Sequence, residues 1–434
     1  MENKTANVKE LNEKSKTDNH KKCVLNLPIS VIFVIIIKFA MNIKVKHEKD
    51  KNYYHVSFQD KKMFNEVIKT EINKKILECR FGYGMSIRDI HKLIEGYYSI
   101  GYIQTLCKKS AIEAEKKMSV LNHCTMNKAK TMIFDETFLK TIENGTVRLG
   151  VVADEFGLIR AIEIIPGKMK HKKLVRLFKS CITEHYTPLY FISDYDNSYP
   201  KAIREVLSNI EIYKDFVHAT RQVFANINST INKMQVKINK SCKITKTKQK
   251  EIVALKKRLL RKQINKIMKY LYKGFSCNKV SVGTIYLEGF LHELEALANK
   301  YSSILPLYDK TKKFFKKYLE TWNQQMKSYA ADSIPLTSNI IESKNSIFKS
   351  FSKKSKSFKQ KNLKSYYCAI ALYENFDIKT RGKNADTSAV IRAGVDFEKF
   401  GAQDFFEAVG IKSISKITSR NLLSITDENM QGVA

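Results

Sequence analysis

Three acidic residues stand where a buried strand or an ordered helix could bring their carboxylates together. Asp135 lies inside the apolar segment IFDETF, Asp194 follows the apolar run LYFIS, and Glu342 lies within SNIIESKNSIFK. A carboxylate taken out of water is costly unless a cation compensates it, and divalent cations are commonly bound by such oxygen ligands. These residue types therefore predict a Mg²⁺ or Mn²⁺ site.

Neither aspartate is diagnostic by itself, because an isolated Asp at a strand end is most often a turn former or a helix cap. Glu342 adds a helical face to the pattern. Asn339 precedes it by three residues and Lys349 follows it by seven. At about 100° per residue, all three lie within about 60° of Glu342 around the helix axis. That face is expected to present a carboxylate, an amide and an ammonium together.

The elements that must position Asp135 and Asp194 alternate between the strand and the helix period. The expected order is strand, strand, strand, helix, strand, helix, strand, in the segments TMIFDETF, TVRLGVVAD, LIRAIEIIP, HKKLVRLFKSCITEHY, LYFIS, SYPKAIREVL and EIYKDFVHA. This order predicts a mixed sheet with helices on its faces, in which the fourth strand returns beside the first. Asp194 would then lie at the carboxyl end of a strand, where open α/β sheets place their chemistry.

A helical pattern is expected after the linker HEKDKN, and two helices are predicted between Met85 and Lys109, with Ser86 and Ser99 as their N-caps. The second helix buries Ile103 on one side. Its other side exposes the polar residues Gln104, Lys108 and Lys109. This layout is typical of a helix-turn-helix with a polar recognition helix, and an ordinary helical hairpin is the alternative.

The charge balance favours a polyanionic partner. The 434 residues include 77 Lys and Arg against 43 Asp and Glu, a formal net charge of +34. Fifteen of these cations and one acid, Glu251, fall between Lys233 and Lys273. An apolar stripe is expected there at Ile252, Leu255, Leu259, Ile264, Ile267 and Leu271. Candidate phosphate contacts are Lys256, Lys257, Arg258, Arg261, Lys262, Lys344 and Lys349.

Two further features bear on location. The apolar stretch from Val24 to Ile43 is long enough to span a bilayer, but Pro28 and Lys38 interrupt it, so a buried strand or an N-terminal extension is favoured over membrane insertion. The eight cysteines form no Cys-x-x-Cys pair, which predicts reduced thiols in a cytoplasmic protein.

Taken together, the motifs resemble the DDE transposases of insertion sequences. Asp135, Asp194 and Glu342 match the Asp, Asp and Glu of that family in order and in the elements that carry them. Asp194 and Tyr199 are similar to its second-Asp motif, and Lys349 matches a basic residue that many members keep after the Glu. The long interval before Glu342 resembles mutator-type members, in which an all-helical insertion precedes the Glu helix.

The resemblance implies a ribonuclease-H-like mixed sheet with an all-helical insertion and an N-terminal helix-turn-helix domain. It also implies metal-dependent strand cleavage and transfer with two Mg²⁺ or Mn²⁺ ions. Asp135 is expected to bridge the ions, with Asp194 and Glu342 each on one side. Supporting roles fall to His218, Tyr199 and Asn339. Four nearby acids are interpreted as structural, namely Glu136, Asp154, Glu155 and Asp196.

The implied partner is double-stranded DNA, at the element ends and at the target, bound by a homo-oligomer in the cytoplasm at the nucleoid. The expected segments are a tail with the apolar stretch at 1–47, the helix-turn-helix domain at 48–118, catalytic parts at 131–228 and 331–378, the basic helical insertion at 229–330 and a C-terminal tail at 379–434.

The chain also departs from the family pattern. Pro335 and Ser338 stand where some members have Tyr and Arg ahead of the Glu, and Asp215 replaces the Cys that mutator-type proteins often have before the equivalent of His218. A non-catalytic helix-turn-helix DNA-binding protein and an inactive remnant of a transposase therefore remain as alternatives.

Overall fold

The structure is a computed structural model. It describes residues 44–48, 53–57, 61–126, 128–141, 145–167, 170–194, 196–215, 218, 220–221, 223–227, 229, 246–277, 279–301, 305–332, 335, 339–354, 360–379 and 384–413. The chain divides into two compact units. The first comprises 1–124, 139–147 and 347–434, and the second comprises 125–138 and 148–346.

The second unit is built on a five-stranded mixed sheet whose strand order is β5-β4-β3-β6-β7. The strands are β3 (Thr131–Thr141), β4 (Gly145–Asp154), β5 (Ile159–Pro166), β6 (Tyr190–Ser193) and β7 (Glu211–Lys214). The predicted return of the fourth strand beside the first is confirmed, since β6 pairs with β3 in parallel. Strand β7 continues the parallel part beyond β6.

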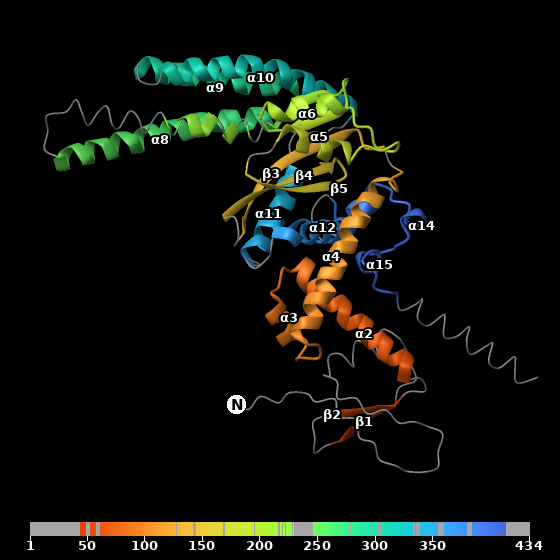
Figure 1. Ribbon diagram of the computed structural model, residues 1–434. Coiled ribbons are helices and arrows are strands. Elements are labelled where there is room, and N and C mark those ends of the chain that lie inside the picture. The colour runs from red at the N-terminus through yellow and green to blue at the C-terminus, as the bar shows by residue number, and fades with distance from the viewer. Residues whose placement is uncertain are drawn as a thin grey trace, which may run out of the picture. The chain divides into compact units, whose positions relative to one another are not determined.

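Helices α5 (His171–Lys179) and α6 (Ser198–Val206) cover one face of this sheet (Figure 1). Their apolar sides meet Met132 and Phe134 of β3 and Phe191 of β6 in one buried cluster. Side chains alternate across a strand, so Phe134 faces these helices while Ile133 and Asp135 face the other way. Helix α5 ends earlier than predicted, because Thr183 and Tyr186 form a β-bridge after it.

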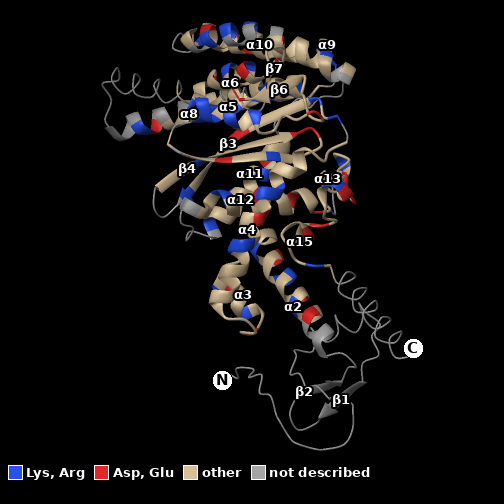
Figure 2. Cartoon of the chain, turned by 45° about the vertical axis from the view of Figure 1, so that its right-hand side comes forward, with Lys and Arg blue, Asp and Glu red and all other residues tan. Residues whose placement is uncertain are grey.

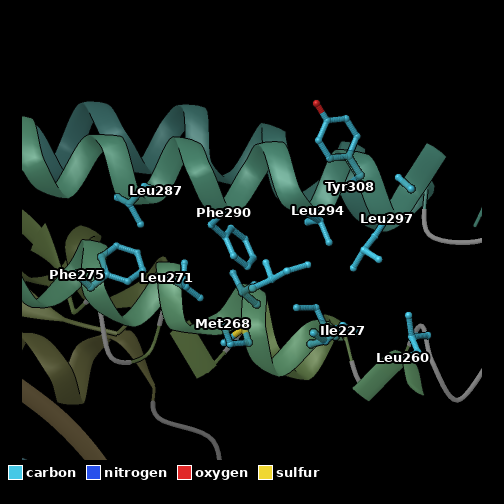
Figure 3. Close-up of a cluster of buried hydrophobic side chains, with 14 of the residues drawn as sticks. Ile227, Leu260, Met268, Leu271, Phe275, Leu287, Phe290, Leu294, Leu297 and Tyr308 are labelled. Atoms are coloured by element: carbon cyan, nitrogen blue, oxygen red, sulfur yellow. The ribbon is translucent and has the colours of Figure 1, made fainter. Parts of the chain in front are cut away.

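Three long helices form a second core in the same unit: α8 (Lys246–Ser276), α9 (Val280–Lys300) and α10 (Leu305–Asp332). Figure 3 shows Leu287, Phe290 and Leu294 of α9 pointing toward Met268 and Leu271 of α8. The expected stripe on α8 is partly wrong. Ile264, Ile267 and Leu271 are buried as expected, whereas Leu255 and Leu259 are 59% and 53% exposed. Leu260, which was not expected in the stripe, is buried.

Helix α11 (Asn339–Lys354) follows, and Glu342 lies in its first turn. The predicted helical stretch up to Asn375 is described as two helices, α11 and α12 (Gln360–Phe376), and residues 355–359 lie outside the described residues. In the first unit, Phe348 and Phe351 of α11 make edge contacts with Tyr367 of α12. Helix α12 packs against α4 (Ile100–Asn122).

The first unit contains the predicted pair of capped helices, α3 (Ile87–Leu93) and α4. Ser86 accepts a hydrogen bond from the backbone N–H of Asp89, and Ser99 accepts one from that of Tyr102, so both predicted N-caps are confirmed. Ahead of them lie α2 (Lys61–Leu77) and the π-helical turn η1 (Glu78–Gly82). The helical pattern expected directly after the linker is wrong, since β1 (Lys44–Glu48) and β2 (Tyr53–Ser57) form an antiparallel pair.

The C-terminal segment has a structural role in this unit. Its three short helices are α13 (Ala389–Arg392), α14 (Phe397–Phe400) and α15 (Phe405–Ala408). The backbone N–H of Asp396 donates to the carbonyl of Cys124, and Lys117 of α4 donates to the carbonyl of Phe400. These bonds tie the end of the described chain to α4.

Among the described residues, no helix is both long enough and apolar enough to cross a bilayer. The stretch from Val24 to Ile43, for which a buried strand was favoured, lies outside the described residues.

The packing of α9 on α10 gives a test of the helical core. A Cβ at Gly283 would overlap the ring of Trp322 and lie 2.9 Å from the carbonyl oxygen of Gly274. We expect Gly283→Ala to destabilise this core by about 1–3 kcal/mol, through overpacking. Trp322 is the sole tryptophan of the chain, so its fluorescence during urea unfolding reports on this core.

Gly289→Ala is the matched control on the same helix, because its Cβ would lie 3.5 Å from the nearest atom, on Tyr270. Alanine is the better helix former, so this variant should be neutral or up to about 1 kcal/mol more stable. Equal urea midpoints for the two variants would contradict the packing described for Gly283.

Candidate metal centre

The register of the parallel strands aligns three aspartates. Ile133 of β3 pairs with Ile192 of β6, so Asp135 and Asp194, each two residues further on, lie opposite one another. Ser193 of β6 pairs with Lys214 of β7, which places Asp194 opposite Asp215. Neighbouring strands are about 4.8 Å apart, so the three carboxylates gather at the carboxyl ends of β6 and β7, beside the middle of β3.

Of the two aspartates predicted from the sequence, Asp135 is the more constrained by burial and hydrogen bonding. It is only 9% exposed, and its Oδ2 accepts a hydrogen bond of 2.8 Å from the side-chain amide of Asn345. Burial raises the pKa of Asp135 to about 6, with Asp194 contributing in the same direction, while His218 opposes the shift. The site thus holds a buried carboxylate that is costly to ionise.

Asp194 shares this environment. Burial raises its pKa, and the positive charges of His218 and Lys214 lower it. The Lys214 ammonium also donates to the backbone carbonyl of Asp194 at 3.2 Å. Asp135 and Asp194 therefore belong to one electrostatic cluster.

Glu342 reaches the same cluster from α11, but through residues that the sequence analysis did not rank as ligands. Ligand atoms of Asp215, His218 and Glu342 lie within 4.8 Å of one another. The predicted trio of Asp135, Asp194 and Glu342 does not form so tight a group among the described residues. His218 belongs to the close group and also interacts with the predicted aspartates, because the charges of Asp135 and Asp194 raise its pKa.

Asp215 is fully buried, and its Oδ2 lies 2.8 Å from Nδ1 of His218. This bond is the main reason that the pKa of His218 is raised. The sequence carried a signal for Asp215 that was missed: like Asp194, it directly follows a short strand. The expected strand EIYKDFVHA was too long, and β7 ends at Lys214.

Glu342 is also bound by Arg221, which the sequence analysis did not single out. Nη1 of Arg221 donates to Oε1 of Glu342 at 2.8 Å, and Nη2 donates to Oε2 at 3.2 Å. Such a two-pronged contact is the preferred geometry between a guanidinium and a carboxylate. The cluster thus combines four carboxylates with the cationic side chains of His218, Arg221 and Lys214.

Helix α11 presents a different amide to the cluster from the one predicted. Asn345, three residues after Glu342, binds Asp135, whereas Asn339 is exposed. Lys349 is exposed as well. Lys344 is only 7% exposed, so its place among the expected surface cations is wrong.

Tyr199, the remaining predicted supporting residue, is buried in α6 against Phe134. Burial is the main cause of its raised pKa, and the nearby carboxylates of Asp194 and Glu136 add to the shift. Tyr199 also hydrogen-bonds Glu136. Tyr199 therefore contacts β3, the strand that carries Asp135, from the face of the sheet that α5 and α6 cover.

The four acids interpreted as structural each have a structural partner. Glu136 pairs with Arg148 at 2.8 Å, and Asp154 pairs with the buried Arg160 at 2.8 Å. Glu155 accepts backbone hydrogen bonds from Lys130 and Thr131, and Asp196 accepts one from Ser198. The interpretation of these residues as structural stays a prediction.

The predicted DNA contacts lie on α4, α8 and α11. On α4, Gln104, Lys108 and Lys109 are exposed, and on α8, Arg258, Arg261 and Lys262 are exposed. Figure 2 shows Lys and Arg along α8 and α10. The side chains of Lys256 and Lys257 lie outside the described residues.

The donor set of the cluster fits a divalent cation. Carboxylate oxygens are the ligands that Mg²⁺ and Mn²⁺ prefer, and imidazole suits transition metals. Burial disfavours the ionised form of Asp135 and Asp194, which a bound cation would compensate. The cluster can therefore hold a divalent cation.

Comparison of the chain with models of known protein families and with curated proteins finds no match.

The raised pKa of Asp135 has a consequence for stability. Its folded pKa of about 6 exceeds the ordinary value of 3.8, so its contribution to stability is full below about pH 4 and is lost as the pH rises through 6. In EDTA at pH 7.5 we expect Asp135→Asn to be more stable than the wild type, by up to about 3 kcal/mol. Urea unfolding followed by Trp322 fluorescence measures this.

At pH 4 the difference between Asp135→Asn and the wild type should shrink toward zero, because Asp135 is then largely protonated. Asp309→Asn, at an exposed position of α10, is the control and should match the wild type at both pH values. If Asp135→Asn were less stable than the wild type at pH 7.5, other groups of the protein would already compensate the negative charge of Asp135.

Proposed function

We propose that this protein is a DDE-type transposase, which binds the ends of an insertion sequence and catalyses metal-dependent cleavage and transfer of DNA strands. The observation that carries the proposal is the group formed by Asp215, His218 and Glu342, whose ligand atoms lie within 4.8 Å of one another, beside Asp135 and Asp194, whose charges raise the pKa of His218. Asp135 lies on β3, Asp194 follows β6 and Glu342 lies on α11, which are the elements that the resemblance implies.

The topology supports a ribonuclease-H-like core for this function. The sheet order β5-β4-β3-β6-β7 puts the strand bearing Asp135 in the centre, with Asp194 on its parallel neighbour. Helices α8, α9 and α10 separate β7 from the helix bearing Glu342. This corresponds to the helical insertion of mutator-type members.

Each acidic residue then has a defined task. Asp135, held by Asn345, would provide the central shared carboxylate, with Asp194 on one side and Glu342 on the other. Two bound Mg²⁺ or Mn²⁺ ions would supply activation of the attacking oxygen and stabilisation of the leaving oxygen. Because phosphoryl transfer depends chiefly on positioning and charge neutralisation, these side chains need to orient groups and not to attack.

Asp215 and His218 extend this set of residues. Asp215 lies beside Asp194 in the register, and its bond to Nδ1 of His218 orients the imidazole. The two residues occupy the positions where mutator-type members often have Cys and His. They support the proposal as part of the same site.

DNA is the polyanionic substrate that suits the charge of the chain. The helices α3 and α4 would act as a helix-turn-helix that recognises the element ends. The exposed cations of α8 would contact phosphates independently of sequence. The protein would act as a homo-oligomer on DNA at the nucleoid.

Catalysis is tested with plasmid DNA that carries the gene and its flanking sequences. We expect Asp135→Asn, Asp194→Asn and Glu342→Gln each to abolish Mg²⁺- or Mn²⁺-dependent strand cleavage and to retain DNA binding. Loss of a metal-binding carboxylate removes the chemistry but not the cationic surface.

Asp196→Asn is the matched control, since Asp196 is exposed two residues from Asp194 and caps the start of α6. It should cleave like the wild type. Wild-type cleavage by any one of the three variants would remove that residue from the proposed site.

DNA binding is tested separately on the two helices. Arg258→Ala, Arg261→Ala and Lys262→Ala should each weaken binding to all sequences and reduce the slope of log affinity against log salt by about one. Gln104→Ala should change the preference among sequences, because an amide at this position would contact base edges. Fluorescence anisotropy over a salt series measures both effects.

Lys116→Ala is the control on α4, where the ammonium pairs with Glu113 at 3.2 Å. An unchanged salt slope in all three α8 variants would mean that α8 is a solvated helix without a DNA contact.

A non-catalytic DNA-binding protein is the second candidate. The pairing of both Glu342 oxygens with Arg221 favours it, because this contact competes with cation binding. Such a protein would bind DNA with the same salt dependence. It would show no metal-dependent cleavage in the wild type.

A further inference from the structure

Arg221 and the cation-binding residues compete for the same carboxylate. The guanidinium engages both oxygens of Glu342, at 2.8 and 3.2 Å. The same carboxylate has a ligand atom within 4.8 Å of Asp215 and His218. A divalent cation bound to Glu342 would need at least one of the oxygens that Arg221 holds.

The contact between Arg221 and Glu342 is well suited to exchange. The Arg221 side chain is 61% exposed, while that of Glu342 is 24% exposed. Exposed ion pairs are weak, because water solvates both partners and the long side chain loses freedom in the pair. Arg221 can therefore leave Glu342 at small cost.

A released Arg221 would remain beside the cluster. Arg221 follows His218 by three residues, and side-chain atoms of both lie close to the Glu342 carboxylate. The planar fork that fits the Glu342 carboxylate also fits a phosphate, with two parallel hydrogen bonds. The substrate class of the proposed function brings phosphates to this place.

We propose that Arg221 is a phosphate-binding residue of the site, which exchanges Glu342 for a DNA phosphate when a divalent cation takes Glu342. This inference rests on the proposed function and adds a residue to it. Cation binding and DNA binding then favour each other through Arg221, and the coupling is reciprocal. Without DNA, Arg221 stays on Glu342. The site then binds the cation less tightly than the same carboxylates would if Arg221 were absent.

The first test is the affinity of the DNA-free full-length protein for Mn²⁺, measured from the free Mn²⁺ signal in electron paramagnetic resonance. Arg221→Gln should bind Mn²⁺ about two- to tenfold more tightly than the wild type, because a competing cation has been removed. Arg221→Lys should lie between the two. Arg204→Gln, at an exposed position of α6, should match the wild type.

The second test is the affinity of the same variants for a short DNA duplex, by anisotropy, in Mg²⁺ and in EDTA. In Mg²⁺, Arg221→Gln should bind DNA about three- to tenfold more weakly than the wild type, since one phosphate contact is lost. In EDTA the loss should be less than about twofold, because wild-type Arg221 is then held by Glu342.

Two outcomes would overturn the proposal for Arg221. One is Mn²⁺ affinity in Arg221→Gln that is unchanged or lower, which would make Arg221 a support for Glu342. The other is a loss of DNA affinity of equal size in Mg²⁺ and in EDTA. Failure of the proposed function itself is distinguishable: wild-type Mn²⁺ binding would then be absent, or would be unaffected by Glu342→Gln.

Discussion

The central constraint on this structure is that acidic side chains lie together where buried strands pair in parallel. This placement is costly, because burial disfavours the ionised form of a carboxylate. Asp135, Asp194 and Asp215 come into line because β3, β6 and β7 pair in parallel with fixed registers. Burial raises the pKa of Asp135 and of Asp194, so their ionised forms oppose folding. A divalent cation bound between these carboxylates would offset this cost.

The surrounding elements position this arrangement. On one side of the sheet, Phe134 and Phe191 pack against α5 and α6, which fixes the face toward which Asp135 points. On α11, Glu342 and Asn345 lie three residues apart, so one turn of helix supplies both a carboxylate for the cluster and an amide for Asp135. The helices α8, α9 and α10 form their own apolar core between β7 and α11 in the chain.

Much of this was accessible from the sequence, because strand and helix periods differ strongly around Asp135 and Asp194. The alternation of apolar residues predicted the strands, the helices between them and the side of β3 that carries Asp135. Capping residues predicted the starts of α3 and α4, since Ser86 and Ser99 each precede an apolar period.

What the sequence did not predict were contacts set by tertiary packing. Arg221 and Glu342 are distant in the chain, and no local pattern relates them. Asp215 was missed because the predicted strand extended past it. Asn345 was missed because Asn339, which is also three residues from Glu342, was equally plausible. The stripe on α8 was misplaced because Leu259 and Leu260 are adjacent, and only packing against α9 decides that Leu260 is buried.

The most direct measurement is the anomalous diffraction of Mn²⁺ in crystals of the full-length protein. The account predicts anomalous peaks within coordination distance of the Asp135 carboxylate, with Asp194 and Glu342 as further ligands. Peaks confined to other surfaces of the protein, with none beside Asp135, would contradict it.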